Sequence, residues 1–109
     1  MFHEAERALG DWAPELRSVR IKLGLPELLA QLGEEGAELS QAALKMRRVL
    51  DKHNPTPVTL NEAEANLAEE FADVLVCMMA VGISTDEVAR NIRRKIPRWV
   101  DRLDVWEEV

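Results

Sequence analysis

Two pairs of acidic residues inside apolar helical patterns constrain this chain more than any other feature. Glu35 and Glu38 form one pair, and Glu70 and Asp73 form the other, with the two acids of each pair three residues apart. Residues i and i+3 lie side by side on one face of a helix. The spacing therefore predicts two pairs of adjacent acids on two helices. These four acids are either separately solvated or parts of one site.

The surrounding residues place these acids on faces that pack against a neighbour. Steps of four and three residues define two apolar stripes of the kind that faces another helix, each interrupted once by a glutamate. The first stripe is Leu28, Leu32, Glu35, Leu39, Ala42 and Met46, and the second is Ala63, Leu67, Glu70, Val74, Cys77 and Val81. An ionised carboxylate taken out of water without a partner costs several kcal/mol, so something must neutralise these acids.

A divalent cation is the partner that the residue types favour. Four carboxylates without histidine make an all-oxygen site for a hard ion, which favours Mg²⁺, with Mn²⁺ as the alternative. The predicted ligands are Glu35, Glu38, Glu70 and Asp73. The competing interpretation is that the acids are exposed or paired with Lys and Arg, in which case the chain would be a non-catalytic helical interaction module.

The acids also form a motif. Glu34-Glu35-x-x-Glu38 followed by Glu70-x-x-Asp73 resembles the EExxE…ExxD signature of the all-α, MazG-like nucleoside triphosphate pyrophosphohydrolases. The segments 32–45 and 67–81 and the basic ending Lys95-x-x-Arg98-Trp99 are similar to the same family, so that the resemblance covers roughly residues 25–103.

This resemblance implies an activity, a site and an assembly. The activity is Mg²⁺-dependent hydrolysis of a nucleoside triphosphate to the monophosphate and pyrophosphate. Glu34 would position or deprotonate the attacking water, and three basic residues would hold phosphate oxygens: Lys45, Lys95 and Arg98. Residues 1–109 would be a single all-α domain of antiparallel helices that completes four-helix bundles as a homodimer or homotetramer.

Two further enzyme classes use acidic metal sites on helices. A phosphoribosyl-ATP pyrophosphohydrolase shares the helical fold and the acidic metal site, so assays must separate it from the first interpretation. A ferritin-like di-metal protein needs two Glu-x-x-His motifs, and this sequence has none.

Charge and composition narrow the range of partners. The net charge of −6 argues against a nucleic-acid binder, although six of the 14 basic residues fall within residues 90–102. The longest apolar run, residues 74–83, is too short to cross a bilayer, so no membrane association is expected. Cys77 is the single cysteine, which predicts a buried thiol and fits a reducing cytoplasm. An apolar content of 47% is high for a lone small helical unit and favours oligomerisation.

Capping and breaking residues predict the helix boundaries. The N-terminal helix should divide near Gly10, with Asp11 as the N-cap of the second piece and Pro14 in its first turn. The acidic motifs should lie on helices of about residues 26–52 and 60–81, joined by a loop over residues 53–58. Gly82 should end the latter helix and Ser84 should cap a fourth that packs antiparallel to it, with Pro97 kinking or ending that fourth helix.

The three tryptophans are predicted to be core or interface residues. Trp12, Trp99 and Trp106 all fall on the apolar stripes of the first and last helical segments.

Overall fold

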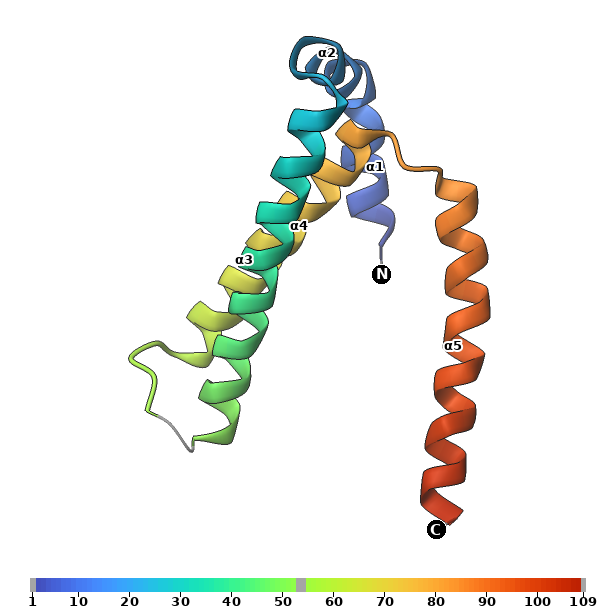
Figure 1. The fold of residues 1–109 in the computed structure, drawn as a ribbon. Coiled ribbons are helices and arrows are strands. Elements are labelled where there is room, and N and C mark those ends of the chain that lie inside the picture. The colour runs from blue at the N-terminus through green and yellow to red at the C-terminus, as the bar shows by residue number, and fades with distance from the viewer. Residues whose placement is uncertain (1, 53–54, 109) are drawn as a thin grey trace.

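The chain is helical throughout the part that the structure describes. A computed structural model describes residues 2–52 and 55–108, with side chains described as far as residue 104, and this part contains no strand (Figure 1). The helices are α1 (His3–Asp11), α2 (Ala13–Leu23), α3 (Leu25–Asp51), α4 (Leu60–Val81) and α5 (Thr85–Glu108). The predicted all-α class is confirmed, and the two acidic motifs lie on α3 and α4.

An antiparallel pair of long helices, α3 and α4, forms the centre of the fold (Figure 1). Both predicted stripes face this contact, since every residue in them is buried or half-buried. The fully buried apolar side chains among the described residues are Leu28, Ala42, Ala63 and Ala80. Because three of these four are alanines, the two backbones can approach closely along the pair. Helix α2 crosses the end of the pair and packs on both helices, and α1 leads into α2.

The predicted ends of α4 are confirmed. The Thr59 hydroxyl accepts a hydrogen bond from the backbone N–H of Glu62 at 3.1 Å, which satisfies one of the free donors of the first turn. Gly82 closes the helix in the left-handed conformation, with φ of 80°, where a side chain would be strained and would collide with the guanidinium of Arg20. After Ser84, the N–H of Glu87 bonds the Ser84 hydroxyl at 3.3 Å, so that α5 begins as predicted.

The boundaries near residues 11 and 52 differ from the predictions. Asp11 is the last residue of α1, and Trp12 is the N-cap of α2, without a side-chain cap hydrogen bond. Pro14 does lie in the first turn of α2, as predicted. Helix α3 ends at Asp51, because Lys52 adopts a left-handed conformation. The predicted loop then begins at His53 and Asn54, which lie outside the described residues.

Helix α5 differs from the predictions at two points. It does not end at Pro97, since its surface is exposed there and the carbonyl that proline leaves unbonded can be solvated, while the kink that was the other predicted effect of Pro97 stays a prediction. It also does not pack along α4. The residues after Gly82 lead the chain away from α4, and α5 stands apart from the other helices (Figure 1). The short connection between α4 and α5 therefore does not by itself make the two helices pack against each other.

Within the described ranges, no helix combines the length and the apolar character that crossing a bilayer requires.

Candidate metal centre

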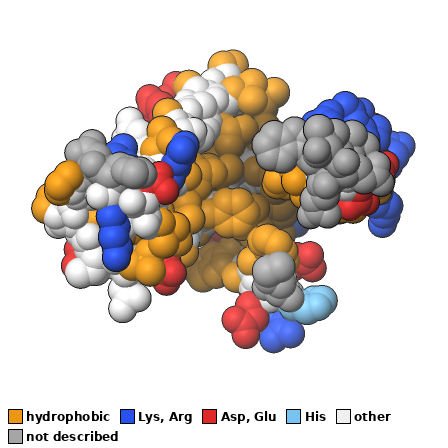
Figure 2. All heavy atoms as spheres, turned by 90° about the horizontal axis from the view of Figure 1, so that it is seen from below, with side chains coloured by type: hydrophobic (Ala, Val, Ile, Leu, Met, Phe, Trp, Pro, Cys, Tyr) orange, Lys and Arg blue, Asp and Glu red, His pale blue; other side chains and the backbone are white. Residues whose placement is uncertain are grey.

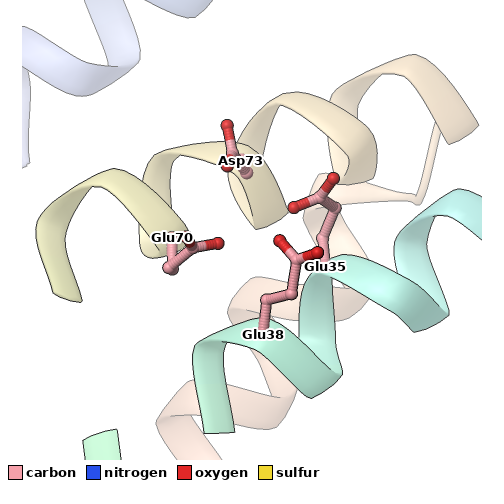
Figure 3. Close-up of side chains that lie close together, drawn as sticks. All are labelled: Glu35, Glu38, Glu70 and Asp73. Atoms are coloured by element: carbon pink, nitrogen blue, oxygen red, sulfur yellow. The ribbon is translucent and has the colours of Figure 1, made fainter. Parts of the chain in front are cut away.

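Four carboxylates from the central helix pair converge at one point. Glu35 and Glu38 reach across from α3, and Glu70 and Asp73 meet them from α4 (Figure 3). One carboxylate oxygen from each residue lies within 4.8 Å of the other three. We call these four residues the acidic cluster. It forms because the stripes place one glutamate of each motif in the helix contact and the other acid one turn away.

Two oxygens of the acidic cluster lack the partners that buried oxygens normally have. Glu35 Oε2 and Glu70 Oε2 are both removed from solvent, and neither accepts a hydrogen bond. The other oxygen of Glu35 accepts one from Gln31 Nε2 at 3.3 Å. Buried acceptors without partners are uncommon in folded proteins, and a bound ion is one of the explanations for such groups.

The electrostatics of the acidic cluster favour protons or a cation. The pKa of the Glu35 carboxyl is raised by its removal from water and by repulsion from Glu38 and Asp73, against a lowering hydrogen bond from Gln31. The pKa of Glu38 is raised chiefly by Glu70, with which it can share a proton and from whose charge it is repelled. A cation among these oxygens would remove that repulsion and release the protons.

The donor set fits a hard divalent ion. All four ligands are carboxylates, and carboxylate oxygens are what Mg²⁺ and Mn²⁺ prefer. Around octahedral Mg²⁺, opposite oxygens are about 4.1 Å apart and adjacent oxygens about 2.9 Å apart. Carboxylate oxygens that lie up to 4.8 Å from one another must therefore draw closer together or bind through coordinated water. Mg²⁺ commonly keeps several of its waters, which makes this spread compatible with it.

A hollow of about 590 Å³ is lined partly by the acidic cluster and carries charges of both signs. Glu38 and Glu70 form its acidic side, and Lys45 and Arg48 supply two cations from α3. The remaining lining residues are Gln41, Ala42, Leu44 and Asn66. Carboxylates beside cations suit a ligand that carries a metal on its phosphates, since the metal needs the acids and the outer oxygens need the cations.

The other predicted site residues are not brought to this point within one chain. Glu34 is exposed on α3 and lies outside the acidic cluster. Lys95 and Arg98 lie on α5, where they line a separate hollow of about 270 Å³ with Trp99 and Arg102. Their predicted roles therefore remain predictions, and for Lys95 and Arg98 they depend on what α5 contacts.

Sequence reasoning missed Arg48 and Asn66. Arg48 is three residues beyond Lys45, so helical spacing could have placed both cations on one face. Asn66 is four residues before Glu70 and shares its face in the same way. Neither residue belongs to a sequence motif, so the sequence alone did not distinguish Arg48 and Asn66 from other polar residues.

Cys77 lies in the helix contact near the acidic cluster. It is half-buried rather than fully buried as predicted. Burial raises the pKa of its thiol, and repulsion from Glu35 and Asp73 raises it further. The thiol therefore stays protonated at neutral pH, which disfavours a nucleophilic role.

Comparisons of this chain with protein-family models, with curated proteins and with solved structures found no match. Function is therefore inferred from the geometry of the acidic cluster together with the resemblance of the motif.

Proposed function

We propose that this protein is a Mg²⁺-dependent nucleoside triphosphate pyrophosphohydrolase, which cleaves its substrate to a nucleoside monophosphate and pyrophosphate. The observation that supports this most is the convergence of four carboxylates, two of them with buried oxygens that lack partners. The arrangement of these residues along the sequence resembles the EExxE…ExxD signature. Mn²⁺ is the alternative ion.

The residues of the hollow divide the work of substrate binding. The acidic cluster would hold Mg²⁺, which stabilises negative charge on phosphate oxygens and acidifies a water molecule. Lys45 and Arg48 would bind phosphate oxygens at the other side of the hollow. Lysine offers a point charge and arginine a planar pair of donors, so the two would hold a phosphate chain in one orientation.

Water activation is assigned to Glu34, on the strength of the motif. Its exposed side chain is adjacent in sequence to Glu35 and lies outside the acidic cluster. Lys95 and Arg98 would add positive charge to the substrate site if α5 of the same or another chain reached it.

The direct test is pyrophosphate release from a panel of ribo- and deoxyribonucleoside triphosphates with Mg²⁺. Phosphoribosyl-ATP is included because hydrolysis of that compound alone would identify the related activity. Activity on none of them, together with no saturable Mg²⁺ binding by calorimetry even with a non-hydrolysable nucleotide, would instead identify a non-catalytic helical module.

Glu38→Gln is the matched variant for this assay. It keeps the shape of the side chain but removes a predicted metal ligand whose neutral form the acidic cluster already favours, so helix content should be unchanged. We expect turnover to be lost. Pyrophosphate release at the wild-type rate by this variant would refute the proposed site.

A further inference from the structure

The side-chain amide of Asn66 is a half-buried polar group without a partner. Among the described residues, no group exchanges a hydrogen bond with this amide, although its side chain is only partly accessible to solvent. The amide of Asn91, in contrast, donates a hydrogen bond to the carbonyl of Glu87 at 2.8 Å. An asparagine can donate two hydrogen bonds, and polar groups removed from solvent are normally satisfied. The amide of Asn66 is therefore available to a ligand of the hollow that it lines.

Asn66 lies on the same side of the acidic cluster as the two cations of the hollow. Lys45 and Arg48 follow Glu38 by seven and ten residues, which places them about 10 and 15 Å further along α3 at 1.5 Å per residue. Helix α4 runs antiparallel to α3, so Asn66, four residues before Glu70, is displaced in the same direction (Figure 1). This end of the α3–α4 pair faces the viewer in Figure 2, where Lys and Arg side chains are visible on it. The hollow thus has carboxylates at one end and hydrogen-bond donors toward the other.

The direction of the side chains brings these donors to one space. Helical side chains lean toward the N-terminus of their helix, so Lys45 and Arg48 lean toward the acidic cluster. Asn66 is on the antiparallel helix and leans the opposite way, toward the level of Lys45. Donors from α3 and α4 therefore approach the same space from both walls. Within the described part of the chain, no aromatic residue lines the hollow, so it lacks a surface on which a nucleobase would stack, and it suits a small anion with several oxygens.

We propose, on the basis of the proposed function, that Asn66 donates hydrogen bonds to the pyrophosphate leaving group. The substrate then lies with its outer phosphates toward Lys45 and Arg48 and with its nucleoside on the other side of the acidic cluster, toward α2. Pyrophosphate carries more negative charge than the nucleoside monophosphate, so the end of the hollow that holds two cations suits pyrophosphate.

The hydrolysis breaks the bridge between the α- and β-phosphates. The oxygen of one water molecule bonds to one of the two phosphorus atoms of this bridge, and the bond from that phosphorus to the bridging oxygen breaks. The bridging oxygen leaves with the other product, and the two protons of the water pass to the products or to solvent. Donors on both walls of the hollow hold the departing pyrophosphate in either case.

A neutral donor suits this position better than a third cation. Asn66 is one helical turn from Glu70, and a lysine at this spacing would pair with the carboxylate and compete with a metal ion. The amide supplies hydrogen bonds without such pairing. The variant Asn66→Asp has nearly the same shape but places a negative charge beside the pyrophosphate.

Binding of the two products separates this contact from turnover. Calorimetry in Mg²⁺ measures the affinity of the full chain for inorganic pyrophosphate and for deoxynucleoside monophosphates. Asn66→Ala should weaken pyrophosphate binding about tenfold or more, because a hydrogen bond to a charged group is lost, and should leave monophosphate binding unchanged. Asn66→Asp should weaken pyrophosphate binding further. Asn61→Ala, at an exposed position of α4 outside the hollow, is the control and should bind both products as the wild type does.

Arg48→Gln is a second variant, at an exposed position where substitution does not disturb packing. It should likewise weaken pyrophosphate binding and spare monophosphate binding. Helix content and the midpoint of thermal unfolding, measured for each variant, show whether its fold is kept.

Each contrary result has a distinct meaning. If the wild type hydrolyses triphosphates and Asn66→Ala binds pyrophosphate equally well, Asn66 does not contact the leaving group and the proposed function is unaffected. If the variants weaken monophosphate binding instead, the substrate lies in the opposite direction and the proposal is wrong. A wild-type chain that neither binds pyrophosphate nor releases it from any triphosphate would refute the proposed function, and the role of Asn66 with it.

Discussion

Replacing Glu70 by glutamine should stabilise the metal-free fold and reduce the additional stabilisation that Mg²⁺ provides. Glu70 is half-buried, and its Oε2 is buried without a hydrogen-bond partner. Without a metal, the carboxylate is repelled by the charges around it, so the neutral amide should stabilise the fold. With Mg²⁺, the same carboxylate is a ligand, so the amide should reduce the stabilisation that the ion provides. Replacement of an acid that served only packing or solubility would leave the Mg²⁺-induced stabilisation unchanged.

The geometry sets the magnitude of the first effect. The carboxylates of Glu70 and Asp73 have oxygens no more than 4.8 Å apart. At that distance two unit charges repel by about 3.5 kcal/mol at an effective dielectric constant of 20 and by about 0.9 kcal/mol in bulk water. Both side chains are half-buried, so solvent screens part of the repulsion and Glu70→Gln should stabilise the metal-free fold by about 1–3 kcal/mol. The midpoint of thermal unfolding should rise by about 4 °C or more.

The stabilisation by Mg²⁺ depends on the ion concentration relative to the dissociation constant, and this sets how much of it the Glu70→Gln variant loses. An ion present at a hundredfold excess over its dissociation constant stabilises the wild type by about 2.7 kcal/mol. Loss of one ligand that weakens binding tenfold reduces this to about 1.4 kcal/mol.

The assay is thermal unfolding at pH 8, at one fixed protein concentration, in EDTA and in Mg²⁺. Glu69→Gln is the matched control, because it makes the same change of charge one residue earlier on α4, at an exposed position outside the acidic cluster. The reasoning would be refuted if Glu70→Gln lowered the midpoint in EDTA and left the Mg²⁺-induced shift equal to that of the wild type.

Two further predictions follow from the same site. The folded-state pKa values of Glu35 and Glu38 are raised above 4.5, so between that pH and the raised values the folded chain holds more protons than the unfolded chain. Without metal, the stability that these two groups contribute is therefore present at low pH and is lost as pH rises through their folded-state pKa values, whereas Mg²⁺ affinity rises over the same range. Urea unfolding measures the stability and calorimetry measures the Mg²⁺ affinity, each at pH 5 and pH 7.5, with Glu38→Gln as a reference that lacks one of the two groups. Stability and affinity that do not change between these pH values would contradict the prediction. Arg48→Gln should raise KM for a triphosphate about tenfold or more and leave Mg²⁺ binding unchanged. The side chain of Arg47 pairs with Asp51 and does not line the hollow, so Arg47→Gln should leave both KM and Mg²⁺ binding unchanged. Equal effects of the two substitutions on KM would contradict the role of Arg48 in substrate binding.

The positions of the helices and the ends of α4 could be predicted from the sequence because they depend on local interactions. Thr59 and Gly82 mark the ends of α4, since a cap hydrogen bond and a left-handed residue are needed there whatever the rest of the chain does. Helical periodicity likewise fixed the faces of α3 and α4, and this was sufficient to bring the acidic cluster together. Glu35 and Glu70 each interrupt a stripe that faces the other helix, so packing of the two helices places both glutamates in the same contact.

The tertiary structure decided what lies next to each face, because periodicity states that a face is apolar but not which neighbour covers it. Arg48 lines the hollow and Glu34 lies outside the acidic cluster because of the way α3 packs on α4. The same limit explains α5, whose apolar spacing predicted a packed helix, although its own chain leaves that face uncovered. Helical faces are encoded within a few turns of sequence, whereas the partner of a face depends on contacts between distant residues or between chains.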